Sequence, residues 1–287
     1  MKRKTLESLL DQPSKLPNVP KVTQALLESF GNDAISIDEI GRQLSADPAL
    51  SAKLLRLANS AYFNVSRSIA TLDDALRMLG FVMVRNLVLG NGMVAAFKNT
   101  PGINLQQFWR YNLYTACAAR WLAHRQESNS DLVFTVGLLH GIGQLQMHTQ
   151  MAAELAPLDA QINVLAPGRA ALEQQTLGFH HGDVAAELAR IWKLPAPIVD
   201  ALRAVPDPIA VEAFSEAAGW VQLGAWRARA EVLKLDVQAQ LDSYPKALGA
   251  RLGIKPDWAP SQAGKPSGAE PMPAMEELTE GLEAMLG

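Results

Sequence analysis

Apolar residues recur at intervals of three and four along most of the chain, which is the period of an amphipathic α-helix. Two clear runs are Leu72, Ala75, Leu76 and Leu79, and Leu132, Val136, Leu139 and Ile142. No segment shows the convincing period-two alternation of a β-strand, and no Asn-Gly or Asp-Gly hairpin joins two β-branched runs. The pattern predicts an all-α, multi-helix bundle.

Helix start signals agree with this pattern. Asp47 before Pro48 is typical of an N-cap followed by the first helical residue, and Thr71 and Ser130 stand at the start of later apolar runs. The expected helices span about 19–30, 37–45, 48–58, 72–79, 81–97, 105–125, 131–148, 168–178, 181–192 and 196–204, and further helices are expected within 209–250.

The character of the sequence changes near its end. Residues 259–274 are rich in Pro, Gly, Ser and Ala and cannot bury enough apolar surface to order themselves, so we expect a flexible linker. Residues 275–287 predict a short acidic helix with one apolar stripe. The stripe consists of Met275, Leu278, Leu282 and Met285. It makes this segment a candidate docking helix, which packs on a partner or on the chain's own body.

Composition limits the class of protein. Hydrophobic residues make up 48% of the 287 residues and charged residues 19%, as in a folded globular protein. The formal net charge is −3, so no broad positive surface attracts a phosphate backbone. A nucleic-acid-binding role would rest only on Lys2, Arg3 and Lys4, and we expect no nucleic-acid partner.

The sequence also predicts a cytoplasmic protein. Cys117 is the single cysteine, which excludes an intramolecular disulfide. Glu7 and Asp11 interrupt the apolar run that a signal peptide would need, and no stretch of about 18 apolar residues indicates a membrane span.

The most informative stretch is VGLLHGIGQL at residues 136–145, which places His140 in an apolar helix. From the residues alone, His140 is either a buried histidine bonded to a carbonyl oxygen or a functional group. The segment resembles the LLHDIGK signature of the HD superfamily. These are metal-dependent phosphohydrolases, in which an adjacent His-Asp pair helps to hold metal ions that activate water.

Further segments extend the resemblance over about residues 14–205, to the HDOD family, the output-type branch of that superfamily. They are LPNVP at 16–20, LSADPALSAKLLRLANSAYF at 44–63, DALRMLG at 74–80, Phe108-Trp109, and Glu173, Gly178, His181 and Trp192-Lys193-Leu194-Pro195. The resemblance implies a helical domain at 14–208, and with the helix pattern it divides the rest of the chain before the linker into an N-terminal arm at 1–13 and a helical extension at 209–258.

The chain departs from the pattern of the active HD enzymes. Gly141 stands where the aspartate of the pair would be, and Tyr111 and Asn112 stand near the position of a first histidine ligand. The His-His pair that often follows the Trp-x-Leu-Pro helix would fall near Ala204 and Val205. The resemblance therefore implies a degenerate site with no metal, no cofactor and no catalysis.

The candidates that remain for a ligand or partner pocket are His140, Glu173, His181, Asn59 and Ser60. Glu173 and His181 are eight residues apart and could meet around a turn, although Glu173 also fits a local cap or salt bridge. Asn59, at the end of a predicted helix, fits a C-cap better than a ligand contact. His124 and His148 are expected at helix C-termini, where the helix dipole favours positive charge.

We therefore expect a non-catalytic bacterial regulatory module that binds a protein partner or a small ligand. The resemblance implies a pathway related to two-component or cyclic-dinucleotide signalling. The alternative is a residual phosphohydrolase that acts on a nucleotide or phosphoester, with a single metal held by His140, His181 and carboxylates.

Overall fold

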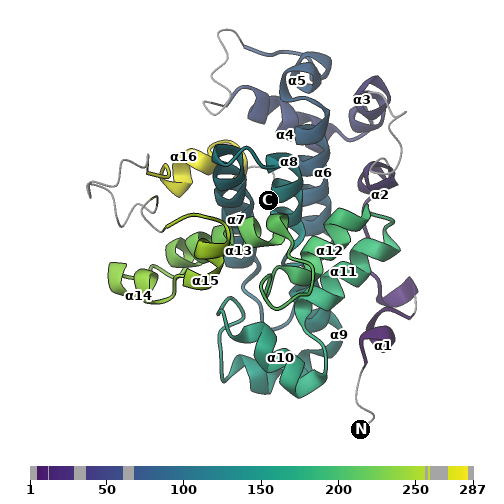
Figure 1. Ribbon diagram of the computed structural model, residues 1–287. Helices are drawn as coiled ribbons and strands as arrows, with labels where there is room; N and C mark the ends of the chain where they lie inside the picture. Colours follow the sequence, from purple (N-terminus) through teal and green to yellow (C-terminus); the bar gives the residue numbers. More distant parts are fainter. Residues whose placement is uncertain are drawn as a thin grey trace.

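The computed structural model describes residues 5–11, 13–28, 37–60, 68–255, 258 and 271–283. All the regular secondary structure of these residues is helical (Figure 1). The all-α prediction is confirmed. The helices are α1 (Leu6–Leu10), α2 (Lys21–Glu28), α3 (Ile37–Ser45), α4 (Pro48–Ala58), α5 (Leu72–Leu79), α6 (Phe81–Ala96), α7 (Leu105–Arg125), α8 (Ser130–Leu139), α9 (Ile142–Asp159), α10 (Arg169–Leu177), α11 (His181–Ile191), α12 (Ala196–Ala204), α13 (Glu216–Val232), α14 (Val237–Asp242), α15 (Lys246–Arg251) and α16 (Met275–Thr279), with a 3-10 turn η1 (Pro13–Lys15).

Local capping signals start several helices close to where the sequence predicts them. The Asp47 side chain accepts a hydrogen bond of 3.0 Å from a first-turn amide of α4, and Pro48 is the first residue of that helix. Thr71 caps α5 in the same way at 3.2 Å. The cap of α8 is Asn129, one residue before the predicted Ser130. Each cap satisfies an amide that has no partner inside its helix.

The predicted single helix over 131–148 is wrong, because the chain turns at His140 and Gly141 between α8 and α9. Beyond the turn, α9 packs closely on α11. A Cβ atom added to Gly143 would lie 1.9 Å from the carbonyl oxygen of His181, so only a hydrogen atom fits there. The apolar period continues across the turn, and for this reason the period does not reveal it.

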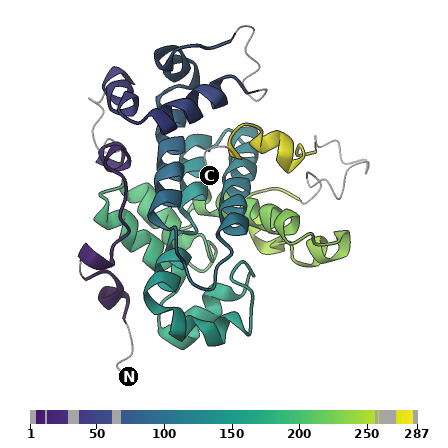
Figure 2. The same ribbon diagram turned by 180° about the vertical axis from the view of Figure 1, so that it is seen from behind.

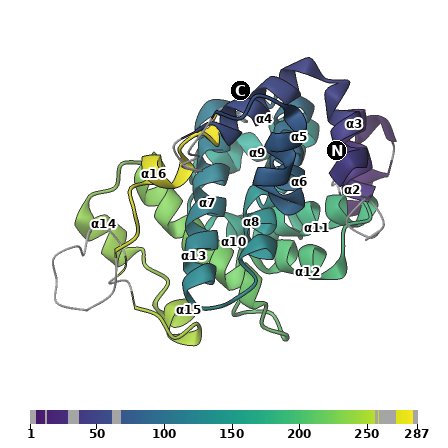
Figure 3. The ribbon, with the colours of Figure 1, turned by 90° about the horizontal axis from the view of Figure 1, so that it is seen from above.

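α7 packs against both α8 and α13 (Figure 3). Glycines allow both approaches. A Cβ atom at Gly137 of α8 would lie 2.6 Å from the Cα atom of Ala116, and one at Gly224 of α13 would lie 2.5 Å from the carbonyl oxygen of Thr115. Ala116 and Thr115 both belong to α7. α13, the first helix of the predicted extension, therefore packs inside the bundle against α7.

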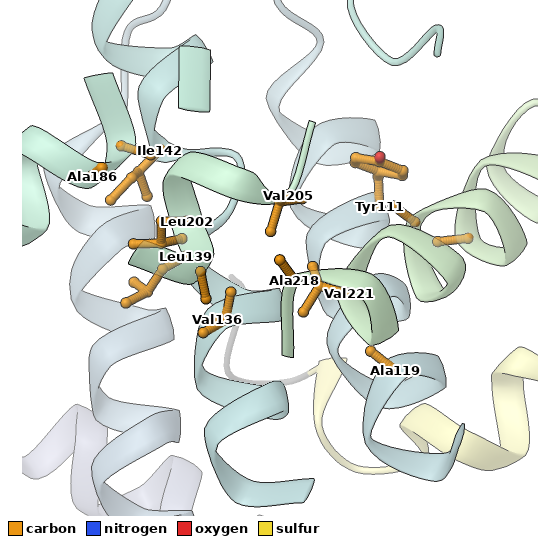
Figure 4. Close-up of a cluster of buried hydrophobic side chains, with 14 of the residues drawn as sticks. Tyr111, Ala119, Val136, Leu139, Ile142, Ala186, Leu202, Val205, Ala218 and Val221 are labelled. Atoms are coloured by element: carbon orange, nitrogen blue, oxygen red, sulfur yellow. The ribbon is translucent and has the colours of Figure 1, made fainter. Parts of the chain in front are cut away.

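One buried cluster joins the segments that the sequence divides into an arm, a central domain and an extension. Figure 4 shows Val205, which follows α12, beside Ala218 and Val221 of α13, with Val136 of α8 nearby. Leu9 of α1 belongs to the same cluster. The arm and the extension therefore share a core with the central helices.

α16 lies on the body of the protein beside α7, so the structure shows the second of the two dockings that its apolar stripe predicts (Figure 2). Met275 and Leu282 are 0% and 1% exposed, and Leu278 is partly buried against the core. Met285 lies outside the described residues. The described apolar side chains of this candidate docking helix thus cover the chain's own core.

Two further contacts hold this segment. Gly281 adjoins Ser60, where an added Cβ atom would lie 2.5 Å from the serine hydroxyl. The Tyr114 hydroxyl donates a hydrogen bond of 3.3 Å to Glu283. Burial, together with the nearby charges of Glu283 and Glu276, raises the pKa of Tyr114 to about 12. The phenol therefore keeps its proton for this bond at neutral pH.

The predicted linker falls mostly outside the described residues. Its described part is ordered by contacts, since Met272 is 2% exposed and its amide donates to the carbonyl oxygen of Trp258 at 2.8 Å. Trp258 is itself buried and packs edge-on against Trp226 of α13. Met272 is therefore held against Trp258, three residues before the start of α16.

No single helix of the described residues combines the length and the apolar composition of a membrane span. One pair of helices, α5 and α6, meets these criteria jointly, and the two are bent by 107° relative to each other.

Candidate functional site

His140 ends α8 and is 7% exposed. Its Nδ1 atom lies 2.6 Å from the carbonyl oxygen of Gly137. A carbonyl oxygen can only accept, so Nδ1 carries the proton of the neutral ring and Nε2 is left as an acceptor. Nε2 is buried and has no hydrogen-bond partner among the described residues. The histidine therefore makes the carbonyl contact of a core residue and still offers one unused acceptor.

The surroundings of His140 keep its ring neutral. Burial, assisted by the nearby charges of His181 and Arg229, lowers its pKa to about 4, although the hydrogen bond to the Gly137 carbonyl acts in the opposite direction. At neutral pH the ring is thus uncharged. Its Nε2 atom can accept a hydrogen bond from a donor, but it has no proton to donate to an anion.

We expect this neutral histidine to make folding depend on pH. An unfolded histidine has a pKa of 6.5, so the unfolded chain binds more protons between pH 6.5 and 4, and the stability that His140 contributes is complete above pH 6.5 and falls as the pH drops toward 4. The expected loss is about 2 kcal/mol between pH 7 and pH 5. Urea unfolding of the wild type and of His140→Gln at both pH values tests this, because the variant should lose that part of the decrease. An equal decrease in both proteins would contradict the assignment.

A largely buried chain of charged and polar groups extends from His181 to His148. Nδ1 and the amide of His181 donate to one oxygen of Glu173 at 2.7 and 2.9 Å. The other oxygen accepts from Arg169 at 2.8 Å, and Arg169 also pairs with Asp159 at 2.7 Å. Asp159 lies 3.3 Å from Nε2 of His148. Both interpretations of Glu173 are therefore realised, since it forms a local salt bridge and meets His181.

The Glu173 carboxylate is held in its charged form. Burial alone would raise the pKa of this group, but the charge of His181 and the hydrogen bonds from His181 and Arg169 outweigh burial and lower the pKa to about 2. The carboxylate fixes the orientation of the His181 ring, so that Nδ1 faces Glu173.

The structure places His148 just before a kink in α9 and not at the C-terminal end of that helix. It lies inside α9 and is 1% exposed, and its Nδ1 atom donates to the carbonyl oxygen of Gln144 at 2.8 Å. Met151, three residues further on, has non-helical φ and ψ angles of −144° and 39°, so His148 lies in the last turn of the helical segment that precedes this kink, and α9 resumes beyond it as far as Asp159. The expected position of His124 is confirmed, because it lies in the last turn of α7.

Gly141 lies against α7. A Cβ atom at this position would lie 2.5 Å from Oδ1 of Asn112 and 2.8 Å from the ring of Phe108. Both polar atoms of the Asn112 side chain are buried and have no partner among the described residues. Tyr111, the neighbour of Asn112, packs edge-on against the His140 ring with a centroid distance of 5.3 Å. The space beside His140 is thus filled by side chains of α7.

A cavity of about 90 Å³ lies next to His140. Its polar lining residues are Tyr111, His140, Gln144, His181, Gln222, Arg229 and Ser243, with the Trp226 indole among them. No described Asp or Glu lines it, because Glu173 lies behind His181. The structure therefore brings His140 and His181 to one cavity, with Glu173 supporting the second.

Helix α13 supplies lining residues that the sequence did not single out. Gln222, Trp226 and Arg229 come from the predicted extension. Arg229 is 9% exposed, and its Nε donates to the carbonyl oxygen of Leu165 at 2.6 Å. An arginine inside an otherwise apolar helix is a signal that could have drawn attention to this position.

Asn59 and Ser60 lie elsewhere. The Asn59 amide donates to the carbonyl oxygens of Leu55 and Ile69, each at 2.8 Å, and its oxygen accepts from the Ile69 amide at 2.7 Å. It therefore closes the end of α4, which is the capping alternative. Ser60 adjoins Gly281, next to α16. Neither residue lines the cavity.

The nitrogen donors that line the cavity are too few to hold a metal ion by themselves. His140 and His181 supply two imidazoles, whereas protein metal sites of this kind use at least three protein ligands. Among the described residues, no group of three His, Cys, Asp or Glu side chains is placed to hold an ion. At position 141 the space for a further ligand is occupied by Asn112 and Phe108.

Three solved structures are similar to this chain over 83% or more of its length. A candidate phosphohydrolase from Shewanella amazonensis is 27% identical, with a TM-score of 0.72 over 97% of this chain and 96% of that one. An HDOD domain protein of unknown function from Geobacter sulfurreducens is 24% identical, with a TM-score of 0.68 over 83% of this chain and 84% of that one. A candidate signal transduction protein from Marinobacter aquaeolei is 21% identical, with a TM-score of 0.66 over 100% of this chain and 61% of that one.

Among curated proteins, an uncharacterized protein of Treponema pallidum is 24% identical over 205 residues. The match covers 70% of this chain and 39% of that protein, so the chain spans well under half the length of this relative.

The family model for the HDOD domain matches residues 16–208. This range contains α2 to α12, the turn at His140 and the pair formed by Glu173 and His181. It ends before α13, which closes the cavity from outside the matched range. The match covers well over half of the sequence, and the chain belongs to the HDOD domain family.

Proposed function

We propose that the chain is a regulatory module of a bacterial signalling pathway, which acts by binding a protein partner or a small ligand and not by catalysis. The packing at Gly141 carries this proposal. Asn112 and Phe108 fill the volume that a side chain beside His140 would occupy. A carboxylate could enter there only if the buried side chains of Asn112 and Phe108 were displaced, and a hydrolase of this superfamily needs that oxygen ligand.

The other groups at the cavity support the same conclusion. The lining combines two imidazoles with the Arg229 guanidinium and no described carboxylate. The positive charge of Arg229 repels a metal ion and attracts an anion, so the electrostatics of the cavity favour anion binding. Membership of the HDOD family and the similarity to a protein named for signal transduction support the signalling role.

The size of the cavity limits its ligand. Its volume of about 90 Å³ is far below the roughly 300–1,000 Å³ of pockets for drug-sized ligands. A cyclic dinucleotide would not fit inside it. A link to a cyclic-dinucleotide or two-component pathway would therefore run through a protein partner, while the cavity would take a much smaller molecule.

The alternative is a residual phosphohydrolase, and the presence of two imidazoles at one cavity favours it. Measurements of metal content and of phosphoester hydrolysis distinguish the two functions. Protein purified without chelator should contain far less than one transition-metal ion per chain by mass spectrometry. It should also cleave p-nitrophenyl phosphate and bis(p-nitrophenyl) phosphate no faster than buffer when Mn²⁺ is added. One or two bound ions per chain, together with turnover that His140→Ala abolishes, would overturn the proposal.

A further inference from the structure

Arg229 is a buried cation without a carboxylate partner. Three arginines are buried among the described residues, namely Arg169, Arg227 and Arg229. Arg169 pairs with Asp159 and Glu173, and Arg227 pairs with Glu231 at 2.8 Å. Arg229 donates one hydrogen bond, from Nε to the carbonyl oxygen of Leu165, and forms no ion pair among the described residues. A buried charge without a counter-charge is costly, so this position favours an anion.

The position of Arg229 makes the cavity the place for that anion. Arg229 lines the cavity together with His140, and its charge acts on the His140 ring. The other titratable groups that line it are Tyr111 and His181, and no described acid competes for the guanidinium there. A ligand in the cavity can therefore supply the negative charge that the protein does not.

His140 adds a second requirement. Its Nε2 atom is a buried acceptor without a partner, because Nδ1 already donates to Gly137. A ligand that satisfies both groups must carry a negative charge for Arg229 and a proton that it can donate to His140. Oxyanions that keep an O–H group at neutral pH have both features, whereas sulfate and simple carboxylates have no proton to donate.

Volume limits this ligand to a few heavy atoms. One water molecule needs about 10–15 Å³ of cavity volume, and this cavity has about 90 Å³. We propose that the cavity between His140 and Arg229 binds a small protonated oxyanion, of the hydrogen phosphate or bicarbonate type. This inference rests on the proposed function, for which it names the chemical class of the small ligand.

The site would depend on the extension as well as on the family domain. His140 and His181 lie within the matched residues 16–208, whereas Arg229 lies on α13, beyond them. The ligand would thus join α8 to α13, and its binding would stabilise the contact between these two helices.

Calorimetric titration of the full-length chain with inorganic phosphate at pH 7 and constant ionic strength tests the proposal, with sulfate as the matched anion that has no proton to donate. Phosphate should bind at least 10-fold more tightly than sulfate. Arg229→Met should weaken phosphate binding at least 10-fold. Arg227→Met, a buried arginine two residues away on the same helix, should leave it unchanged. Equal binding of phosphate and sulfate, or equal behaviour of the two variants, would overturn the inference.

A spectroscopic measurement on the unsubstituted protein covers the case in which Arg229→Met does not fold. Phosphate should shift the ¹⁵N resonance of His140 Nε2 toward that of a hydrogen-bonded acceptor, and sulfate should not. An unchanged resonance at saturating phosphate would also overturn the inference. Hydrolysis of p-nitrophenyl phosphate, measured on the same samples, separates the two failures. Turnover would overturn the proposed function, whereas absent binding without turnover would overturn only the ligand class.

Discussion

Replacing Gly143 by alanine is expected to destabilise the protein by about 3 kcal/mol, at the upper end of the usual cost of overpacking. The new methyl group would lie 1.9 Å from the carbonyl oxygen of His181 and 2.8 Å from the amide nitrogen of Ala185. These are backbone atoms of α11, which cannot rotate away as a side chain can. α9 and α11 must therefore separate, and the midpoint of urea unfolding should fall accordingly.

Gly90→Ala is the matched control for this substitution. Gly90 is also buried in a helix, α6, but its nearest neighbour would lie 4.0 Å from the added methyl group, at ordinary contact distance. Alanine is favoured over glycine in helix interiors by about 1 kcal/mol, so this variant should be at least as stable as the wild type. Equal stability of the two variants would contradict the close packing of α9 on α11.

Arg169→Met is expected to destabilise the protein by about 3–5 kcal/mol at pH 7. The Arg169 and Glu173 side chains are 1% and 0% exposed, so loss of the guanidinium leaves a buried carboxylate with His181 as its remaining partner. Asp159 would lose its contact with Arg169 as well. Unfolding in urea at pH 7 measures the loss.

The double variant Arg169→Met/Glu173→Gln should be more stable than the sum of the two single substitutions predicts, because it removes both members of the buried pair. Arg190→Met serves as the control. Arg190 pairs with Glu187 but is 65% exposed, so its loss should hardly move the unfolding midpoint. Additive effects at positions 169 and 173 would show that the pair is not coupled.

The sequence predicts best what is decided within a few residues. The caps at Asp47 and Thr71 and the closure of α4 by Asn59 depend on one side chain and on backbone groups that are close in the chain. The pair formed by Glu173 and His181 spans eight residues and could still be anticipated. These interactions follow from local geometry, and sequence spacing describes local geometry well.

The features that the sequence misses depend on where distant segments meet. The apolar period runs through His140 and Gly141 without a break, although the helix ends there, because the direction of α9 is set by its packing on α11. The placement of Arg229 beside His140 requires α13 to return along α7. No spacing along the chain contains that information.

The close approach of α13 to α7 has a practical consequence for any shortened form of this protein. The family match ends at residue 208, but Trp220 and Trp226 of α13 are each 2% exposed in the intact chain. A polypeptide that ends at residue 208 would lack α13, so the apolar side chains that pack against this helix would be exposed to water. Exposed apolar surfaces promote self-association. Aggregation of that fragment would then reflect a missing helix and would say nothing about the function of the domain.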